Sequence, residues 1–235
     1  MNFTKSKRSL SPSPYDREKA NVFSERKISY ADLFWVFMLG SVVGFVLEGL
    51  WHMLWHGGVW ESHSATVVGP FCIVYGLGAV VMYVLALSLQ GRSLLVQFAL
   101  YSLVGALVEF EAALFQELCF GSSSWNYSHQ PLNVDGKISL QMSLIWGVLG
   151  VAFAHFAFPL LLRLLTRMQS RGWRIACRAL SVLMAVNLLL TVCAVKRWHD
   201  RRESLMPASE WEHFLDRQYD DQKMKEIFPN MSFQS

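Results

Sequence analysis

Residues 105–150 read GALVEFEAALFQELCFGSSSWNYSHQPLNVDGKISLQMSLIWGVLG, and this stretch decides the fold. An apolar segment carrying Glu109 and Glu111 leads into a polar aromatic turn at 124–128 and a second turn at 133–137, after which the sequence becomes apolar again. Charged side chains are costly in apolar surroundings. The rest of the fold must therefore accommodate these carboxylates.

The composition is that of an integral membrane protein. The 235 residues are 53% hydrophobic and 17% charged, with a mean hydropathy of +0.28, whereas a soluble domain is about 25% charged. The net charge is only +3, and its basic residues cluster in a few segments, which disfavours nucleic acid as a partner and suits contact with anionic lipid. The four cysteines show no CxxC spacing, so we expect packing roles for them and no cofactor.

Five apolar segments approach the roughly 20 residues that cross a bilayer. They lie at about 31–56, 67–88, 94–120, 140–166 and 177–195. The sequence therefore predicts an all-α fold, a polytopic transmembrane helical bundle of about five spans. No internal repeat is apparent, so the inverted-repeat signature of many secondary transporters is missing.

The chain divides into three parts by composition. We expect a disordered basic cytoplasmic tail at 1–29, the transmembrane helical bundle at 30–196, and a C-terminal tail with a short amphipathic helix at 197–235. The tail helix is expected because Ser209 and Glu212 form a capping-box pattern.

Basic residues predict the orientation of the bundle. They are concentrated in the N-terminal tail and in the 163–178 connection, and the positive-inside rule puts both in the cytoplasm. Five spans then place the C-terminus outside. Lys196, Arg197, Arg201 and Arg202 follow the last span and favour the opposite side, so an even number of spans stays open.

Polar residues are predicted to gather in the outer half of the bundle. Glu48 and Glu109 lie at similar expected depth, roughly 5 to 8 Å beyond the midplane at 1.5 Å per residue. An intramembrane charge costs about 3 kcal/mol by insertion scales. The two carboxylates could share a proton, carry protons or bind a cation; alternatively, they only hold the bundle together.

No catalytic residue can be assigned. No metal site is expected, even though Glu48, His52 and His56 share one helical stripe. The candidate substrate- or ion-binding residues are Glu48, Glu109, His52, Tyr75, Trp125, Asn126, Tyr127, Asn133 and Asp135.

Several of these residues fall in motifs that resemble a known family. The motifs are GPFCIVYGLG at 69–78, LVEF at 107–110, GSSSWNYS at 121–128, PLNVDGKISL at 131–140 and SLIWG at 143–147. Together they are similar to the bacterial ABC-transporter permease family, type IV, CmpB-like, over about residues 33–165. The family pattern has proline at Ile73 and aspartate at Asn126, so the resemblance does not imply a base at Asn126.

The resemblance implies a permease component of the bacterial cytoplasmic membrane, and the positive-inside rule gives it a cytoplasmic N-terminus. We expect it to move a small or lipidic solute through the polar site, with the lipid bilayer and a separate ATPase subunit at the arginine-rich 163–178 connection as partners. Two alternatives stay open. One is a membrane-embedded enzyme acting on a lipid-linked substrate, with Glu109 or Glu48 as acid or base and His52 as its partner; the other is a membrane scaffold without catalysis.

Overall fold

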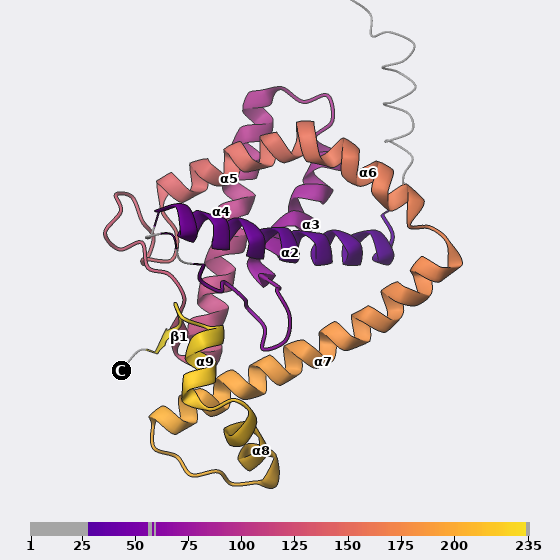
Figure 1. Ribbon diagram of the computed structural model, residues 1–235. Helices are drawn as coiled ribbons and strands as arrows, with labels where there is room; N and C mark the ends of the chain where they lie inside the picture. The colour runs from indigo at the N-terminus through magenta and orange to yellow at the C-terminus, as the bar shows by residue number, and fades with distance from the viewer. Residues whose placement is uncertain (1–27, 56–57, 59, 234–235) are drawn as a thin grey trace, which may run out of the picture.

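A computed structural model describes residues 28–55, 58 and 60–233 of the chain (Figure 1). The tail predicted at 1–29 lies almost wholly outside the described residues. The described elements, in chain order, are α2 (Tyr30–Trp55), α3 (Ile73–Ser88), α4 (Leu94–Phe120), β1 (Ser122–Ser123), α5 (Leu140–Ala152), η1 (Phe153–Ala157), α6 (Phe158–Arg167), α7 (Arg171–Arg202), α8 (Glu210–Gln218), α9 (Asp221–Ile227) and β2 (Ser232–Phe233).

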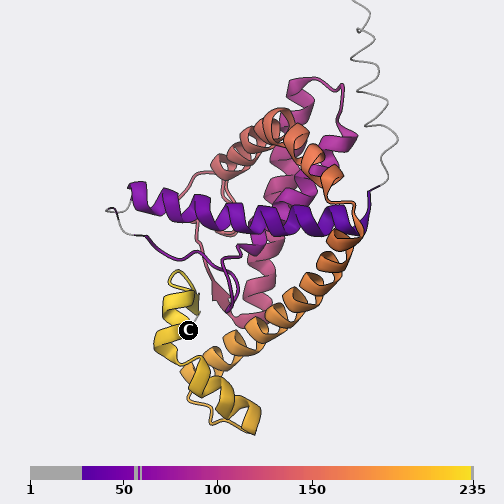
Figure 2. The ribbon, with the colours of Figure 1, turned by 45° about the vertical axis from the view of Figure 1, so that its right-hand side comes forward.

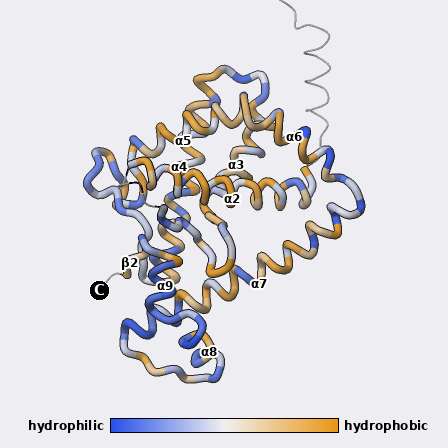
Figure 3. The backbone as a smooth tube through the Cα atoms, in the orientation of Figure 1, coloured by the Kyte–Doolittle hydropathy of each residue, from blue (hydrophilic) through white to orange (hydrophobic). Residues whose placement is uncertain are grey.

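The fold is the predicted all-α polytopic bundle. Within the described residues, four helices are long and apolar enough to cross a bilayer: α2, α4, the continuous α5–η1–α6 helix and α7. The fifth, α3, is apolar but shorter. Figure 3 shows these helices as mainly hydrophobic, whereas α8 and α9 are hydrophilic. Large apolar side chains such as Leu47, Leu118 and Leu189 are exposed on the spanning helices, as expected where a helix faces lipid.

The predicted second span, 67–88, is wrong in its first part. Helix α3 begins only at Ile73, because Gly69 adopts a left-handed conformation with φ of 82° and Pro70 disfavours helical geometry in the residue before it. Non-helical backbone at membrane depth must be satisfied within the protein. Asn187 of α7 does this by donating to the carbonyl oxygen of Val68 at 2.7 Å and accepting from the Val68 amide at 3.2 Å.

The fourth span contains a π-helical segment, η1, which ends two residues before Pro159. Proline lacks an amide hydrogen and clashes with the preceding turn, so the helix widens locally at this point. His155 lies in η1, and its Nε2 is 3.2 Å from Oε1 of Gln97 on α4. This contact joins α4 to the wide turn.

The first four spanning segments form two helical hairpins, α2 with α3 and α4 with α5. In the first hairpin, a methyl group on Gly44 would overlap Tyr75, and one on Gly76 would overlap Ser41. In the second, a methyl group on Gly105 would overlap Trp146, and one on Gly147 would overlap Ser102. Small residues let helices approach closely in a membrane, and both hairpins use them in the same way.

These matching contacts reveal an internal repeat, and the expectation of no repeat is wrong. Residues 37–48 read FMLGSVVGFVLE and residues 98–109 read FALYSLVGALVE, with Phe, Leu, Ser, Val, Gly and Glu at the same places. The partner helices carry Tyr-Gly at 75–76 and Trp-Gly at 146–147. Identities of this kind do not stand out in apolar sequence until the helix contacts align them.

The matched residues follow one another in the same order in both hairpins. Glu48 and Glu109 end the two matched stretches, and they are therefore equivalent residues of a duplicated unit.

The C-terminal tail folds back on the end of α4. Strand β2 pairs antiparallel with β1, and Ser123 lies opposite Ser232; Figures 1 and 2 show α8 and α9 gathered at the far end of α7. The end of the chain therefore lies beside the start of the 121–139 connection. The number of spans stays a prediction, because four of the described helices are long enough to cross a bilayer and α3 is shorter.

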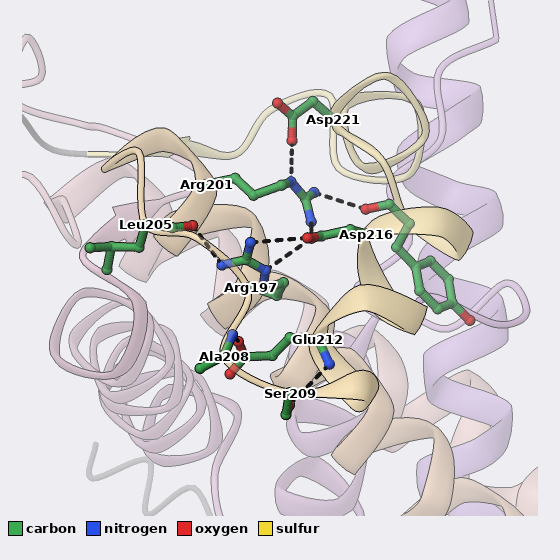
Figure 4. A network of polar contacts seen from close by, with 9 residues as sticks. Arg197, Arg201, Leu205, Ala208, Ser209, Glu212, Asp216 and Asp221 are labelled. Carbon is green, nitrogen blue, oxygen red and sulfur yellow. Dashed lines mark hydrogen bonds and ion pairs between the residues drawn. The ribbon is translucent and has the colours of Figure 1, made fainter.

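Acidic residues of the tail pair with Arg197 and Arg201, two of the basic residues that follow the last span. Arg197, only 3% exposed, donates to both carboxylate oxygens of Asp216 at 2.9 and 3.0 Å. Arg201 contacts Asp216 and Asp221, each at 2.7 Å, as Figure 4 shows. The positive-inside rule counts these arginines as free charges, whereas the fold pairs them.

Asp216→Asn is expected to loosen α8 and α9 from the end of α7. The substitution removes charge-assisted hydrogen bonds, each worth about 1.5 to 3 kcal/mol, and leaves Arg197 buried without its counter-ion. Hydrogen–deuterium exchange should show faster exchange across 205–227 than in the wild type. Glu226→Gln, on the exposed side of α9, is the matched control and should leave exchange unchanged. Unaltered exchange in Asp216→Asn would refute the role of this ion pair.

Acid should weaken the same contact in the wild type. Burial of Asp216 favours its protonation, but hydrogen bonds from Arg197 and Arg201 outweigh burial and hold the pKa of Asp216 below its ordinary value of 3.8. A lowered folded-state pKa means that the stabilisation is present above the ordinary value and is lost as the pH falls through the folded-state value.

Candidate functional site

A cavity of about 1010 Å³ lies between the two hairpins, α7 and the C-terminal tail. Its walls are mainly apolar side chains of α3, α4 and α7, and polar groups of the helices and of the connecting segments also line it. The ionisable residues in its wall include three glutamates and no lysine or arginine among the described residues. The glutamates are Glu48, Glu109 and Glu111.

Glu109 is held from two sides. Its side chain is 5% exposed, and Tyr127 donates its hydroxyl to Oε1 at 2.8 Å while Trp146 donates its indole N–H to Oε2 at 2.8 Å. Helix α4 is thereby tied to the 124–128 turn and to α5. An indole N–H can only donate, so the arrangement suits an ionised carboxylate that accepts at both oxygens.

Glu48 is held in the corresponding way by its own hairpin. Tyr75 of α3 donates its hydroxyl to Oε1 of Glu48 at 2.5 Å, and Tyr75 and Trp146 occupy matching positions of the repeat. The two rings lie 6.2 Å apart between centroids, and Glu48 and Glu109 line the same cavity. The duplicated units therefore meet at the carboxylates and at the aromatic rings that hold them.

Two of the predicted turn residues also reach the cavity. Trp125 and Tyr127 line it, and the indole N–H of Trp125 donates to the carbonyl oxygen of Lys137 at 3.0 Å. Lys137 in turn pairs with Glu117 of α4 at 2.7 Å. The turn is thus fixed over the cavity by contacts with α4 and with the turn that follows it.

The remaining predicted turn residues shape the connection without lining the cavity. Asn126 accepts from the Ser128 amide at 2.8 Å, and Asn133 accepts from the Gly136 amide at 3.1 Å. Asp135 is exposed and pairs with Lys137 at 2.5 Å. Asparagine and aspartate commonly stabilise turns through such local bonds, and that is the role the structure shows for these three.

His52 has a different partner from the one expected. Its Nε2 lies 3.0 Å from Oε2 of Glu61, and its ring lies 5.6 Å from that of His63. It is not among the residues lining the cavity. His56 lies outside the described residues, and no group of three or more His, Cys, Asp or Glu within the described ranges is arranged to hold a metal ion.

Sequence reasoning missed two parts of the site. Trp146 was known only as part of the SLIWG motif, and its match to Tyr75 would have been found by aligning the two aromatic-glycine pairs. The segment 228–231 also lines the cavity, and Nδ2 of Asn230 lies 3.3 Å from Nδ1 of His63. No local pattern indicates that this distant segment returns to the bundle.

The contact between β1 and β2 predicts an efficient cross-link. In an otherwise cysteine-free chain, Ser123→Cys with Ser232→Cys should form a disulfide under mild oxidation, because directly opposed strand residues have the Cα separation that disulfides require. Ser204→Cys in place of Ser232→Cys is the control and should not cross-link. Gel mobility measures both; absence of the bond in the first pair would contradict the folded-back tail.

A comparison with protein families shows to which family the chain belongs. The model of the family described as "Putative ABC-transporter type IV" matches residues 35–192. The chain belongs to this family. No match was found among curated proteins or among solved structures.

Membership of the ABC-transporter type IV family confirms the resemblance seen in the sequence. The matched region contains both hairpins, the two repeated carboxylates and most of α7. With its long apolar helices, this ABC-transporter type IV protein is a membrane transport component. Its location is the membrane.

Proposed function

We propose that this protein is a permease component that moves a small or lipidic solute through the cavity at Glu48 and Glu109. The observation that carries the proposal is the convergence of the two repeated carboxylates on one large cavity in a membrane transport protein. Intramembrane acids generally mark substrate or ion pathways. A cavity of about 1010 Å³ is also large enough for an organic solute.

The orientation of the site follows from the course of the helices. Glu48 and Glu109 lie in the second halves of α2 and α4, and both helices are taken to cross the membrane from the same side. We place the N-terminus in the cytoplasm of a bacterial cell, so the carboxylates lie in the outer half of the cytoplasmic membrane. The 121–139 connection and the C-terminal tail then cover the cavity from outside.

A separate ATPase subunit is proposed to bind the opposite end. Helices α6 and α7 are joined by only three residues, 168–170, so an ATPase would contact the helix ends rather than a long loop. The arginines at this end are all exposed. They are Arg163, Arg167, Arg171, Arg174 and Arg178.

The enzyme alternative has less support from the geometry. It requires His52 as partner of a catalytic glutamate, but His52 pairs with Glu61. Glu109 instead accepts from Tyr127 and Trp146, which is an arrangement for holding the carboxylate in place. The permease proposal needs only that the carboxylates face the cavity.

The test compares cells that produce equal amounts of wild type, Glu48→Gln, Glu109→Gln and the control Glu226→Gln. Mass spectrometry of the medium, the outer membrane leaflet and the cytosol should show one class of solute or lipid redistributed in both cavity variants and not in the control. A compound that is chemically converted rather than redistributed would support the enzyme. Unchanged distributions with folded, abundant protein would refute the permease.

A further inference from the structure

We propose that the cavity binds a lipophilic organic cation, with the positive charge beside Glu48 and Glu109 and the apolar body against α3, α4 and α7. The inference rests on the proposed function in that it names the class of molecule taken by the same site. It is drawn from four properties of the cavity: its charge, its aromatic groups, its apolar walls and its size.

The charge of the cavity is mainly negative. Glu48, Glu109 and Glu111 line it, and no lysine or arginine does so among the described residues; His63 also lines it, with Nδ1 at 3.3 Å from Nδ2 of Asn230. Lys137 pairs with Glu117 and Asp135, and Arg197 and Arg201 of α7 pair with acidic residues of the tail. The carboxylates therefore lack a lysine or arginine partner in the cavity wall, and a low-dielectric site of this kind attracts a cation strongly.

Aromatic rings surround the carboxylates. Tyr75, Trp146, Trp125 and Tyr127 all line the cavity, and the first two donate directly to the glutamates. The face of an aromatic ring attracts a cation and stabilises it further when water is excluded. The rings of Tyr75 and Trp146 would therefore contribute to binding twice, by attracting the cation to their faces and by orienting the carboxylates.

The size and walls of the cavity argue against a small inorganic ion as the occupant. Val104, Leu107, Leu188 and Val192 are among the apolar residues lining it, and a volume of about 1010 Å³ lies at the upper end of the range for organic ligands. A hydrated metal ion would leave most of this apolar surface uncovered. No metal-binding cluster is found within the described part of the chain, whereas a bulky cation would use both the apolar walls and the carboxylates.

The repeat specifies how the charge is shared. Each hairpin supplies one carboxylate, held by one aromatic donor at a matching position, and the Tyr75 and Trp146 rings meet at 6.2 Å. A cation between the hairpins therefore interacts with both glutamates. Loss of either one should weaken binding, and loss of both should abolish it.

The test uses two probe ions of the same shape and opposite charge, tetraphenylphosphonium and tetraphenylborate. Equilibrium dialysis with the purified full chain in detergent should show that the cation binds at least about tenfold more tightly than the anion. Glu48→Gln and Glu109→Gln should each weaken binding of the cation about fivefold or more, and the double variant should not bind it. Glu226→Gln, outside the cavity, should bind as the wild type. Equal binding of the two ions, or cation binding unaffected by the double variant, would overturn the proposal.

A second measurement needs no substitution and covers the case in which the glutamine variants fail to fold. Cys72 lines the cavity, whereas the exposed Cys119 does not. Tetraphenylphosphonium should slow alkylation of Cys72 by N-ethylmaleimide about fivefold, an effect of the size expected from site occupancy, without changing that of Cys119; tetraphenylborate should protect neither. Equal protection of Cys72 by both ions would refute a preference for cations.

These results are separable from those that test the permease. Binding in detergent requires no transport, so selective cation binding together with unchanged solute distributions in cells would refute transport and leave the ligand class standing. Redistribution of a neutral or anionic solute without cation binding would refute the ligand class and leave transport standing.

Discussion

Glu109→Ala is expected to destabilise the bundle by about 3 kcal/mol, because one buried and one partly buried hydrogen-bond donor would lose their acceptor at once, and each buried donor left unpaired costs about 1 to 3 kcal/mol. Those donors are the hydroxyl of Tyr127 and the indole N–H of Trp146. The free energy of unfolding, measured with denaturant in detergent micelles, should fall by this amount.

A neighbouring glutamate provides the control. Glu111 lies two residues away, where it lines the cavity but is exposed, and Glu111→Ala should change stability by less than about 0.5 kcal/mol, as substitutions of exposed residues usually do. If the two substitutions had equal effects, the hydrogen bonds to Glu109 would contribute nothing specific. Proteolysis within 121–139 should also be faster in Glu109→Ala, because this connection loses its attachment to α4.

Gly44→Ala and Gly105→Ala should both destabilise the protein severely, and by similar amounts, because they occupy the same position in the two hairpins. A methyl group at either would overlap the aromatic residue of the partner helix, Tyr75 or Trp146. Overpacking costs about 1 to 3 kcal/mol, occasionally more. We expect about 3 kcal/mol at each site, since the atoms that must move include Cβ of the facing residue rather than the end of a flexible side chain.

Gly172 separates this effect from a general intolerance of alanine. A methyl group there would meet only Oγ of Ser170, at 3.9 Å, so Gly172→Ala at the start of α7 should be neutral or slightly stabilising. Thermal unfolding of the three variants in the same detergent makes the comparison. Strongly unequal effects at Gly44 and Gly105 would contradict the structural equivalence of the two hairpins.

The apolar spans could be read from the sequence because crossing a bilayer is a property of each segment by itself. About 20 apolar residues suffice, and the described helices at 30–55, 94–120, 140–167 and 171–202 follow from that requirement. The second span was placed too early because hydropathy does not register Gly69 and Pro70 as the end of helical geometry. The family motifs were equally visible, since they are local runs of residues.

Contacts between distant segments were decided only by the tertiary structure. Glu48 and Glu109 were recognisable as unusual residues, but their donors Tyr75, Tyr127 and Trp146 lie on other elements. The pairing of α2 with α3 and of α4 with α5 brings them together.

The C-terminal strand illustrates the same limit. Ser232 pairs with Ser123 across 109 residues of chain, and a pattern of local residues carries no information about such a partner. The sequence by itself determined which segments enter the membrane and which acids enter with them. The tertiary structure decided that two repeated hairpins bring those acids to one cavity, because only close packing at glycines sets which faces of the helices meet.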